Sequence, residues 1–304
     1  MNSIYSFPLG ATYWEIDVPL AELSYAQRRR LVWQTFRPRI KRFTYKYVGF
    51  DCDNETSVDR LRDLLVRSKI WLSPPSAFND PFDSQADPIA EGSTAMKRAK
   101  FERLTREHEP EVGGVARRRE VDRMMAMDAS HWSERARMAI TASSAGLGVS
   151  CFTDDPRNLL MWSHYARQHQ GLTIQFEPLR DHRVFLKAIS LDYTRTYPCV
   201  NFFDDESMRD SRQIFSKFED WRYEQERRIV APGGANQWLP FKADALTGIV
   251  VGARFASRAG PVLQRLLNER QAMKSPDVTI YRAKQHRRDY RVTLQRQQSV
   301  LCEG

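Results

Sequence analysis

The sequence predicts an α+β fold with a helical insertion, and three observations support this prediction. Short segments rich in β-branched and aromatic residues, which are typical of strands, recur along the chain. Amphipathic stretches typical of helices interrupt these segments. We therefore expect that most strands do not pair with the next strand in the sequence. Residues 90–142 differ in character, because they carry mixed charges and few β-branched residues. We therefore expect an N-terminal extension at 1–40, a single α+β domain at 41–304, and a helical insertion at about 90–142.

The extension contains one predicted amphipathic helix. In PLAELSYAQRRRLVWQTF, residues 19–36, apolar side chains recur at roughly helical spacing and basic side chains occupy the opposite face. We expect this helix to dock on the main domain. An arm that binds nucleic acid is the alternative interpretation.

The main domain is expected to begin with a strand, RFTYKYVGF at 42–50, because aromatic and β-branched residues dominate it. A helix follows, with Thr56 or Ser57 as its N-cap and Val58 on its apolar face. KIWLS at 69–73 is a short predicted strand that ends at two prolines.

The insertion at about 90–142 is expected to form helices before and after the pair Gly113 and Gly114, as an insertion or lid. No heptad pattern persists for three repeats, so a coiled coil is not expected.

The segment GLGVSCFTDDP at 146–156 predicts a strand followed by a turn. In the helix expected next, Asp154 or Asp155 is the cap, Pro156 lies in the first turn and Gly171 ends the helix. The other expected elements are strands at LTIQFE, FLKAISLDY, ERRIVA, LTGIVVGA and DVTIYRA, and helices at DSRQIFSKFEDW and SRAGPVLQRLLNERQ.

Composition limits the class of protein. The chain has 304 residues and a formal charge of +9, which indicates either a solvated basic face or an anionic partner such as nucleic acid or a phosphate-bearing cofactor. No run of about 18 apolar residues and no secretory signal pattern occurs, so we expect no membrane partner. The four cysteines are far apart, which predicts reduced thiols in a cytoplasmic protein and no zinc site.

Two carboxylates stand out in WRYEQERRIVAPGG, residues 221–234. Glu224 and Glu226 are two apart before a short apolar run, and in a strand they would point to the same face. Such a pair demands a cation, and it suits a site that stabilises a developing positive charge. The alternative is an edge strand in which Arg227 or Arg228 neutralises the pair.

Two further segments contain candidate site residues. In SPPSAFNDPFD, Asp80 and Asp83 could bind a metal with ligands from elsewhere, but bracing of a loop by Asn79 and Asp80 is favoured. Ser150 and Thr153 lie near a predicted strand end, where polar side chains often line a cleft. Neither a GxGxxG nor a GxxxxGK motif occurs, which argues against a kinase or a Rossmann enzyme.

Five blocks of the sequence resemble a bacterial family catalogued as domain of unknown function 2971. They are YKY, KIWLSPPSAFNDPFD, VSCFTDDPRNLLMWSHYARQHQGLTIQFE, WRYEQERRI and IVVGA. The resemblance extends from about Tyr45 to about Tyr290, and the family label itself implies no function.

The order of these blocks is also similar to that of the ADP-ribosyltransferase fold. The resemblance implies a mixed, mostly antiparallel split sheet in which an early strand contacts NAD, a central strand shapes the nicotinamide pocket, and a late strand carries the catalytic glutamate. It makes Glu226 the catalytic carboxylate and Glu224 the residue that positions the acceptor. The residues that it implies for NAD binding are Tyr45, Lys46, Tyr47, Ser150, Thr153, Trp162 and Tyr165. The chain departs from the pattern at Lys46, where His or Arg is usual, and at Cys151–Thr153.

The function implied is that of an NAD-dependent ADP-ribosyltransferase or NAD glycohydrolase, acting as a bacterial toxin or phage-defence effector. NAD is then a substrate, no metal is expected, and the acceptor, a protein or a nucleic acid, is left open together with the oligomeric state. Two alternatives remain. One is a nucleic-acid-binding protein or metal-dependent nuclease, and the other is a non-catalytic interaction module.

Overall fold

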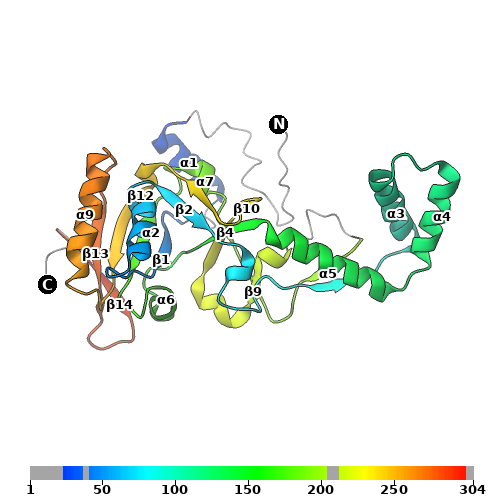
Figure 1. Ribbon diagram of the computed structural model, residues 1–304. Coiled ribbons are helices and arrows are strands. Elements are labelled where there is room, and N and C mark those ends of the chain that lie inside the picture. Colours follow the sequence, from blue (N-terminus) through cyan, green and yellow to red (C-terminus); the bar gives the residue numbers. More distant parts are fainter. Residues whose placement is uncertain (1–22, 37–40, 204–211, 299–304) are drawn as a thin grey trace. The chain divides into compact units, whose positions relative to one another are not determined.

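The computed structural model describes residues 23–36, 41–203 and 212–298. The chain divides into two compact units. Figure 1 labels their helices and strands. Unit 1 comprises residues 1–12, 75–146 and 192–219, and unit 2 comprises residues 13–74, 147–191 and 220–304. Each unit is therefore assembled from segments that are distant in the sequence. The single domain expected at 41–304 stays a prediction.

Unit 2 is built on an eight-stranded sheet with the strand order β14-β13-β12-β5-β1-β4-β10-β6. Six of its seven strand pairings among the described residues are antiparallel, and only β12–β13 is parallel. The prediction of an α+β fold with a mixed, mostly antiparallel sheet is thus confirmed. The strands are β1 (Thr44–Val48), β4 (Leu147–Thr153), β5 (Leu172–Phe176), β6 (Ile189–Ser190), β10 (Glu226–Pro232), β12 (Leu246–Val251), β13 (Thr279–Gln285) and β14 (Val292–Gln297).

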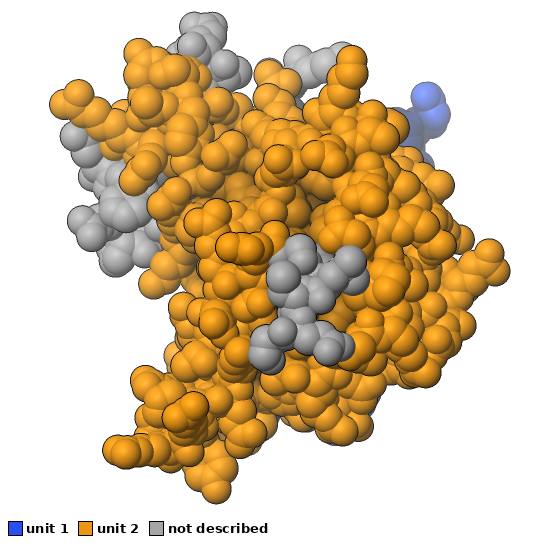
Figure 2. Space-filling view, turned by 90° about the vertical axis from the view of Figure 1, so that its left-hand side faces the viewer, with its two compact units in different colours: residues 1–12, 75–146, 192–219 blue, residues 13–74, 147–191, 220–304 orange. Residues whose placement is uncertain are grey.

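Helices pack on both faces of this sheet, as the alternation of side chains along each strand requires. Leu172, Ile174 and Phe176 of β5 belong to the larger hydrophobic core, together with residues of α2 (Glu55–Leu65) and α9 (Ala259–Ala272). A second cluster contains Tyr47 and Trp162 and brings in α6 (Leu159–Tyr165). The side of unit 2 that carries α9 is turned toward the viewer in Figure 2, where unit 2 is orange.

Two predicted helix caps are wrong, and the same chemistry explains both. The cap of α2 is Asn54, whose side chain accepts a hydrogen bond from the Ser57 backbone N–H. The cap of α6 is Asn158, which accepts from the backbone N–H groups of Leu160 and Met161. Asparagine, aspartate and serine are about equally good N-cap residues, so residue type alone does not separate Asn54 and Asn158 from the Ser and Asp candidates nearby. The predicted helix at 154–171 is consequently shorter.

A left-handed turn ends α6. Arg167, Gln168 and His169 have φ angles of 47°, 54° and 67°. Residues other than glycine rarely adopt this left-handed backbone conformation. Two glycines make room for this turn. A Cβ on Gly252 would lie 2.0 Å from the His169 carbonyl oxygen, and one on Gly171 would lie 2.3 Å from the Val48 carbonyl oxygen. Gly171 therefore serves close packing of the turn, and not only the end of a helix.

The segment between β5 and β10 differs most from its prediction. One strand was expected at FLKAISLDY, but the structure has the short strands β6 and β7 (Asp192–Thr194) after the helix α7 (His182–Phe185). A helix was expected at residues 210–221. Residues 212–214 are helical, but β9 (Ser216–Phe218) and the 3-10 helix η2 (Glu219–Glu224) follow within the same segment. Pairing of β9 with β7 is a tertiary contact, and such contacts override local helix propensity.

Unit 1 contains the insertion, with three helices where two groups separated by Gly113 and Gly114 were expected. They are α3 (Thr94–His108), α4 (Gly114–Met125) and α5 (Ala129–Ala145). An aromatic cluster that includes Phe101, Trp132 and Phe203 forms its core. The other elements of unit 1 are η1 (Pro75–Ala77), β3 (Asp87–Ile89), β7, β8 (Cys199–Asn201) and β9.

Within unit 2, the N-terminal helix α1 (Tyr25–Phe36) is tied to the sheet region by a buried carboxylate, Glu177. Glu177 accepts hydrogen bonds from the Tyr25 hydroxyl, from Arg42 Nε at 3.3 Å and from Arg180 Nε at 2.6 Å. Burial favours the neutral acid, yet these donors outweigh burial, and the pKa of Glu177 is lowered. The remainder of the predicted extension at 1–40 lies mostly outside the described residues.

A small second sheet completes unit 2, where β2 (Lys69–Leu72) pairs with β11 (Gln237–Pro240), and η3 (Ala243–Ala245) precedes β12. The strands β3, β8, β11 and β14 were not predicted, because they are short or lack a long apolar run. In the part of the chain that the structure describes, no helix combines the length and apolarity needed to cross a bilayer.

Candidate active site

The three sequence blocks that suggested an NAD site lie on three adjacent strands of unit 2. Thr153 of β4 is paired with Tyr45 of β1 on one side and with Glu226 of β10 on the other. Paired residues of neighbouring strands point to the same face of a sheet. Tyr45, Thr153 and Glu226 therefore form one row across the middle of the sheet.

The sheet opens next to this row. β1 and β4 are paired at only one position, whereas β4 and β10 are paired along seven and β1 and β5 along five. Lys46 fills the opening with its side chain. Its Nζ donates to Ser150 Oγ at 3.0 Å and to the Cys151 carbonyl oxygen at 3.1 Å. A lysine side chain thus replaces the missing backbone hydrogen bonds between the two strands.

Opposing effects act on the ammonium group of Lys46. It lies 5.2 Å from the centroid of the Phe152 ring, a favourable cation–π distance. Burial lowers the pKa of Lys46, while the charge of Glu226 opposes that shift. Burial and the neighbouring carboxylate therefore act in opposite directions on the Lys46 ammonium group.

Glu226 is paired with an arginine of its own strand. Arg228 Nε lies 2.7 Å from Glu226 Oε1, and a second guanidinium nitrogen lies 3.4 Å from Oε2. The two side chains are only 5% and 1% exposed, so this is a buried ion pair. Residues i and i+2 of a strand share a face, and here the neighbour of Glu226 on that face is Arg228.

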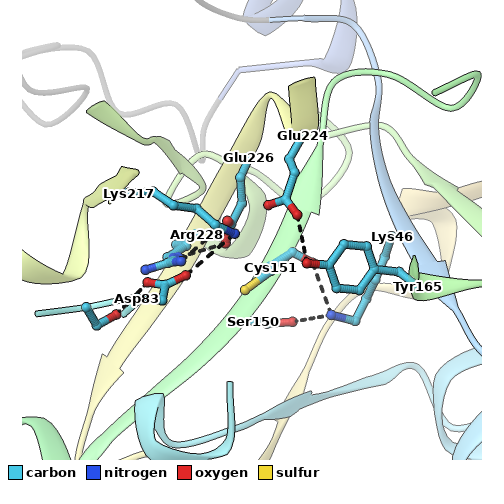
Figure 3. A network of polar contacts seen from close by, with 10 residues as sticks. Lys46, Asp83, Ser150, Cys151, Tyr165, Lys217, Glu224, Glu226 and Arg228 are labelled. Carbon is cyan, nitrogen blue, oxygen red and sulfur yellow. Dashed lines mark hydrogen bonds and ion pairs between the residues drawn. The ribbon is translucent and has the colours of Figure 1, made fainter. Parts of the chain in front are cut away.

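The expectation that Glu224 and Glu226 share one strand face is wrong. Glu224 is the last residue of η2, and β10 begins only at Glu226. Between them Gln225 has a φ of 45°, so the chain turns and no strand geometry relates the two carboxylates. Glu224 accepts a hydrogen bond of 2.7 Å from the Tyr165 hydroxyl instead. Figure 3 shows Glu224 directed toward Tyr165 and Glu226 toward Arg228.

Thr153 fixes the corner that carries both glutamates. Its hydroxyl donates to the Glu224 carbonyl oxygen and accepts from the Asp155 backbone N–H at 3.1 Å. Asn158 adds a bond from its side-chain amide to the Tyr223 carbonyl oxygen at 2.9 Å. Thr153 is almost completely buried, so it positions the backbone of the site and does not line an open surface.

Tyr47 and Trp162, two of the residues expected to bind NAD, lie in the core behind the site. Their rings are 5.2 Å apart in an edge-to-face arrangement. The Trp162 indole N–H donates to the Pro156 carbonyl oxygen at 2.9 Å, and the Tyr47 hydroxyl donates to the Asp155 carbonyl oxygen at 3.0 Å. Both polar groups are satisfied within the protein, so these side chains support the turn after β4.

Of the seven residues expected to bind NAD, Tyr45, Lys46 and Tyr165 are partly exposed, while Tyr47, Ser150, Thr153 and Trp162 are buried. This difference separates groups that can touch a ligand from groups that support them. Ser150 in particular is enclosed and serves as the hydrogen-bond partner of Lys46.

Sequence reasoning missed the role of Cys151. Its thiol hydrogen-bonds to Glu226, and burial, with the Glu226 charge as a second cause, raises the pKa of the thiol well above its ordinary range. The thiol therefore stays protonated at neutral pH and is a poor nucleophile. Its register opposite Arg228 was the signal that could have identified it, and register is not visible in one sequence.

Arg227 points to the other face of β10 and is paired with Asp154. The guanidinium group makes two hydrogen bonds to the Asp154 carboxylate, at 2.6 and 2.9 Å. Such a bidentate pair has defined geometry, and it fastens the start of β10 to the end of β4. Both arginines that the sequence left ambiguous are thus ion-paired, each with a different carboxylate.

The acidic residues considered as metal ligands have protein partners. In unit 1, Asp80 accepts from the Phe82 backbone N–H at 2.9 Å, which agrees with loop bracing, and Asp83 lies 3.5 Å from Lys217 Nζ. One group of metal-capable side chains, Asp51, Cys52 and Asp53, occurs among the described residues. Its carboxylates are paired with arginines, Asp51 with Arg167 and Asp53 with Arg258.

Comparison with known proteins adds nothing to this geometry, because no family model, curated protein or solved structure matches the chain.

Proposed function

We propose that this protein cleaves the bond between nicotinamide and ribose in NAD, and that it transfers the ADP-ribose to an acceptor or to water. The observation that supports the proposal is the row formed by Tyr45, Thr153 and Glu226 across three adjacent strands. These strands carry the three blocks on which the resemblance to ADP-ribosyltransferases rests. The wider fold resemblance and membership of family 2971 are part of the same proposal.

In the proposed reaction the C1′–N bond breaks, and its electron pair stays on the nicotinamide nitrogen. Positive charge then develops on the ribose, and the ionised Glu226 carboxylate stabilises it. The oxygen of water or of the acceptor bonds to C1′ on hydrolysis or transfer, and its proton leaves to solvent. Neither a metal nor a redox partner takes part in this balance.

The neighbours of Glu226 suit that role. Arg228 keeps Glu226 ionised and fixes its orientation, because a cation at 2.7 Å favours the charged carboxylate. Lys46 and the partly exposed rings of Tyr45 and Tyr165 are the groups proposed to contact phosphate and nicotinamide. The Glu226 side chain is 5% exposed, so we expect access of NAD to require an opening of this corner.

Glu224 is assigned a separate role. Its carboxylate is held by the Tyr165 hydroxyl, away from the Glu226–Arg228 pair. We propose that Glu224 positions the acceptor, whose identity stays open between protein and nucleic acid. Action as a bacterial toxin or phage-defence effector in the cytoplasm is the biological setting that this activity would fit.

The proposal is tested by measuring nicotinamide release from NAD by the purified full-length protein. Glu226→Gln should reduce the rate about a hundredfold or more, the cost of removing a well-placed stabilising group. Glu226→Asp keeps the charge beside Arg228 and tests position alone. Glu177→Gln changes an equally buried carboxylate outside the site and should leave the rate within about twofold.

Two results would overturn the proposal. One is the absence of NAD turnover and of label transfer in the presence of cell extract or nucleic acid. The other is equal activity of wild type and a folded Glu226→Asp and Glu226→Gln pair. Either result would favour the alternative of a non-catalytic interaction module.

A further inference from the structure

The hairpin formed by β13 and β14 carries a large excess of positive charge and lies outside the candidate active site. Residues 279–298 contain six Lys or Arg residues but only one acidic residue, Asp289. The six cations are Arg282, Lys284, Arg287, Arg288, Arg291 and Arg296. Nothing in the proposed NAD chemistry uses them.

The charges of this hairpin are not balanced by neighbours. Asp289 is taken up at the tip, where it lies 3.4 Å from Arg291 Nε and 3.1 Å from His286 Nδ1. Within residues 23–36, 41–203 and 212–298, the other five cations make no ion pair. Repulsion among uncompensated like charges costs stability, so such a cluster is typical of a surface that binds an anionic partner.

The helices of unit 1 show the opposite arrangement. Arg103 is paired with Glu107, and Arg106 with Glu102, along the exposed side of α3. Pairs at i and i+4 largely neutralise one another on a helix surface. A high content of arginine alone therefore does not distinguish the hairpin, but the absence of partners among the described residues does.

The hairpin also presents an aromatic ring. Tyr290 lies at the tip between Asp289 and Arg291 and is 99% exposed. The loop between β13 and β14 that carries it lies at the lower end of these two strands in Figure 1. A lone exposed tyrosine needs no explanation, but this ring shares its loop with Arg287 and Arg288, which make no ion pair among the described residues. An exposed aromatic ring beside such cations matches the combination used to bind unpaired bases.

The strand register places hydrogen-bonding side chains beside two of the cations. Gln295 is paired with Arg282, and Thr293 is paired with Lys284, so these four side chains share one face. The buried Arg282 Nε has no hydrogen-bond partner among the described residues. Side chains on one strand face repeat about every 6.6 Å, which lets successive cations contact successive phosphates.

We propose that the β13–β14 hairpin binds a single-stranded nucleic acid. The unpaired cations contact the phosphates, and Tyr290 stacks on a base. An anionic membrane fits the observations less well, because the tip sequence HRRDYR offers no apolar residue besides tyrosine. A single strand is favoured over a duplex because the bases of a duplex are already stacked and leave Tyr290 without a partner.

The test is fluorescence anisotropy of the full-length protein with labelled oligo(dT), oligo(U) and a duplex of equal length, at several salt concentrations. Arg287→Glu/Arg288→Glu should weaken binding at least tenfold and flatten the salt dependence, because each lost phosphate contact lowers the slope by about one. Tyr290→Ala should weaken single-strand binding roughly 5- to 100-fold and change duplex binding little.

The matched control is Arg103→Glu/Arg106→Glu on α3, which alters net charge by the same amount on ion-paired helix residues. It should change affinity less than threefold. Equal weakening by the control, an unaffected Tyr290→Ala, or binding to anionic phosphatidylserine vesicles alone would each overturn the proposal. The assay contains no NAD, and Glu226→Gln should bind normally, so this proposal and the proposed NAD cleavage can fail separately.

Discussion

Glu177 and Glu226 are two buried carboxylates of the same unit, and their surroundings differ. Glu177 collects donors from three segments, Tyr25, Arg42 and Arg180, and so joins parts of the chain that are far apart. Glu226 has an arginine from its own strand and lies beside a thiol and a lysine whose pKa values are both shifted. The first arrangement is that of a structural link.

The difference teaches how a site can be distinguished from a structural link when both are buried and both are ionic. A structural carboxylate such as Glu177 accepts hydrogen bonds from several donors, and these bonds stabilise the packing of the segments that carry the donors. Around Glu226, burial lowers the pKa of Lys46 and raises the pKa of Cys151, so it favours the neutral form of both groups. Perturbed groups clustered in this way are characteristic of functional sites.

The largest expected effect is the loss of Arg228. Arg228→Met removes the guanidinium group that lies 2.7 Å from the buried Glu226 carboxylate and should reduce the free energy of unfolding by about 3–5 kcal/mol. The double variant Glu226→Gln/Arg228→Met removes both charges and should recover most of that loss. Urea denaturation measures both values. If the loss of unfolding free energy in the double variant equals the sum of the losses in the two single variants, Glu226 and Arg228 are not energetically coupled.

Glu177→Gln should have a smaller effect. Three donors lose a charged acceptor, but two of them are half-exposed arginines, so we expect about 1–2 kcal/mol. Limited proteolysis should then cut within residues 25–36 faster than in the wild type. Glu134→Gln, in an exposed pair of α5, is the control and should leave the cleavage rate unchanged.

Acid should act on the same link. The lowered pKa of Glu177 contributes stability above its ordinary range near pH 4.5, and that stability is lost as pH falls through the folded-state pKa. His182, which contacts Arg28 at 2.7 Å, has a pKa lowered by burial and by that arginine, so its protonation below about pH 6.5 works in the same direction. The free energy of unfolding should therefore fall below about pH 6.5 through His182 and fall further below about pH 4.5 through Glu177. Only the second fall should be smaller in Glu177→Gln.

The smallest expected effect compares two tyrosines. Tyr25→Phe removes one donor from Glu177, and Tyr165→Phe removes one from Glu224, at a cost of about 1 kcal/mol each. If Tyr165 also contacts nicotinamide through its ring, Tyr165→Phe should leave the KM for NAD nearly unchanged while Tyr165→Ala raises it. A KM that is equally insensitive to both changes would remove Tyr165 from the proposed site.

Much of the fold could be predicted because its strands are long enough to show a pattern. β4, β5, β10 and β12 were found as apolar or β-branched runs, and α2 and α9 as amphipathic helices. The predictions of the helix N-caps were wrong because Asn54 and Asn158 lie within a few residues of several other good cap candidates. The strand β9 failed because its only support is the distant strand β7.

The candidate site divides in the same way. The catalytic role of Glu226 is predicted from the order of the blocks and stays a prediction, whereas its neighbours in the structure were not predicted. A positive φ at Gln225 separates Glu224 from the strand, and no residue type at that position announces it. The bridge from Lys46 to Ser150 depends on where β1 leaves β4, which is a property of the sheet as a whole.

The left-handed turn at Arg167, Gln168 and His169 has a consequence for making this protein as well as for describing it. Left-handed backbone is the mirror image of what L-residues prefer, at roughly 1–2 kcal/mol per residue. Chemical ligation with D-glutamine at exposed position 168 would remove that cost, whereas at most positions an inverted centre would break the fold. A D-residue is thus expected to stabilise the protein at this position, and the stabilisation would be measured as a higher melting temperature.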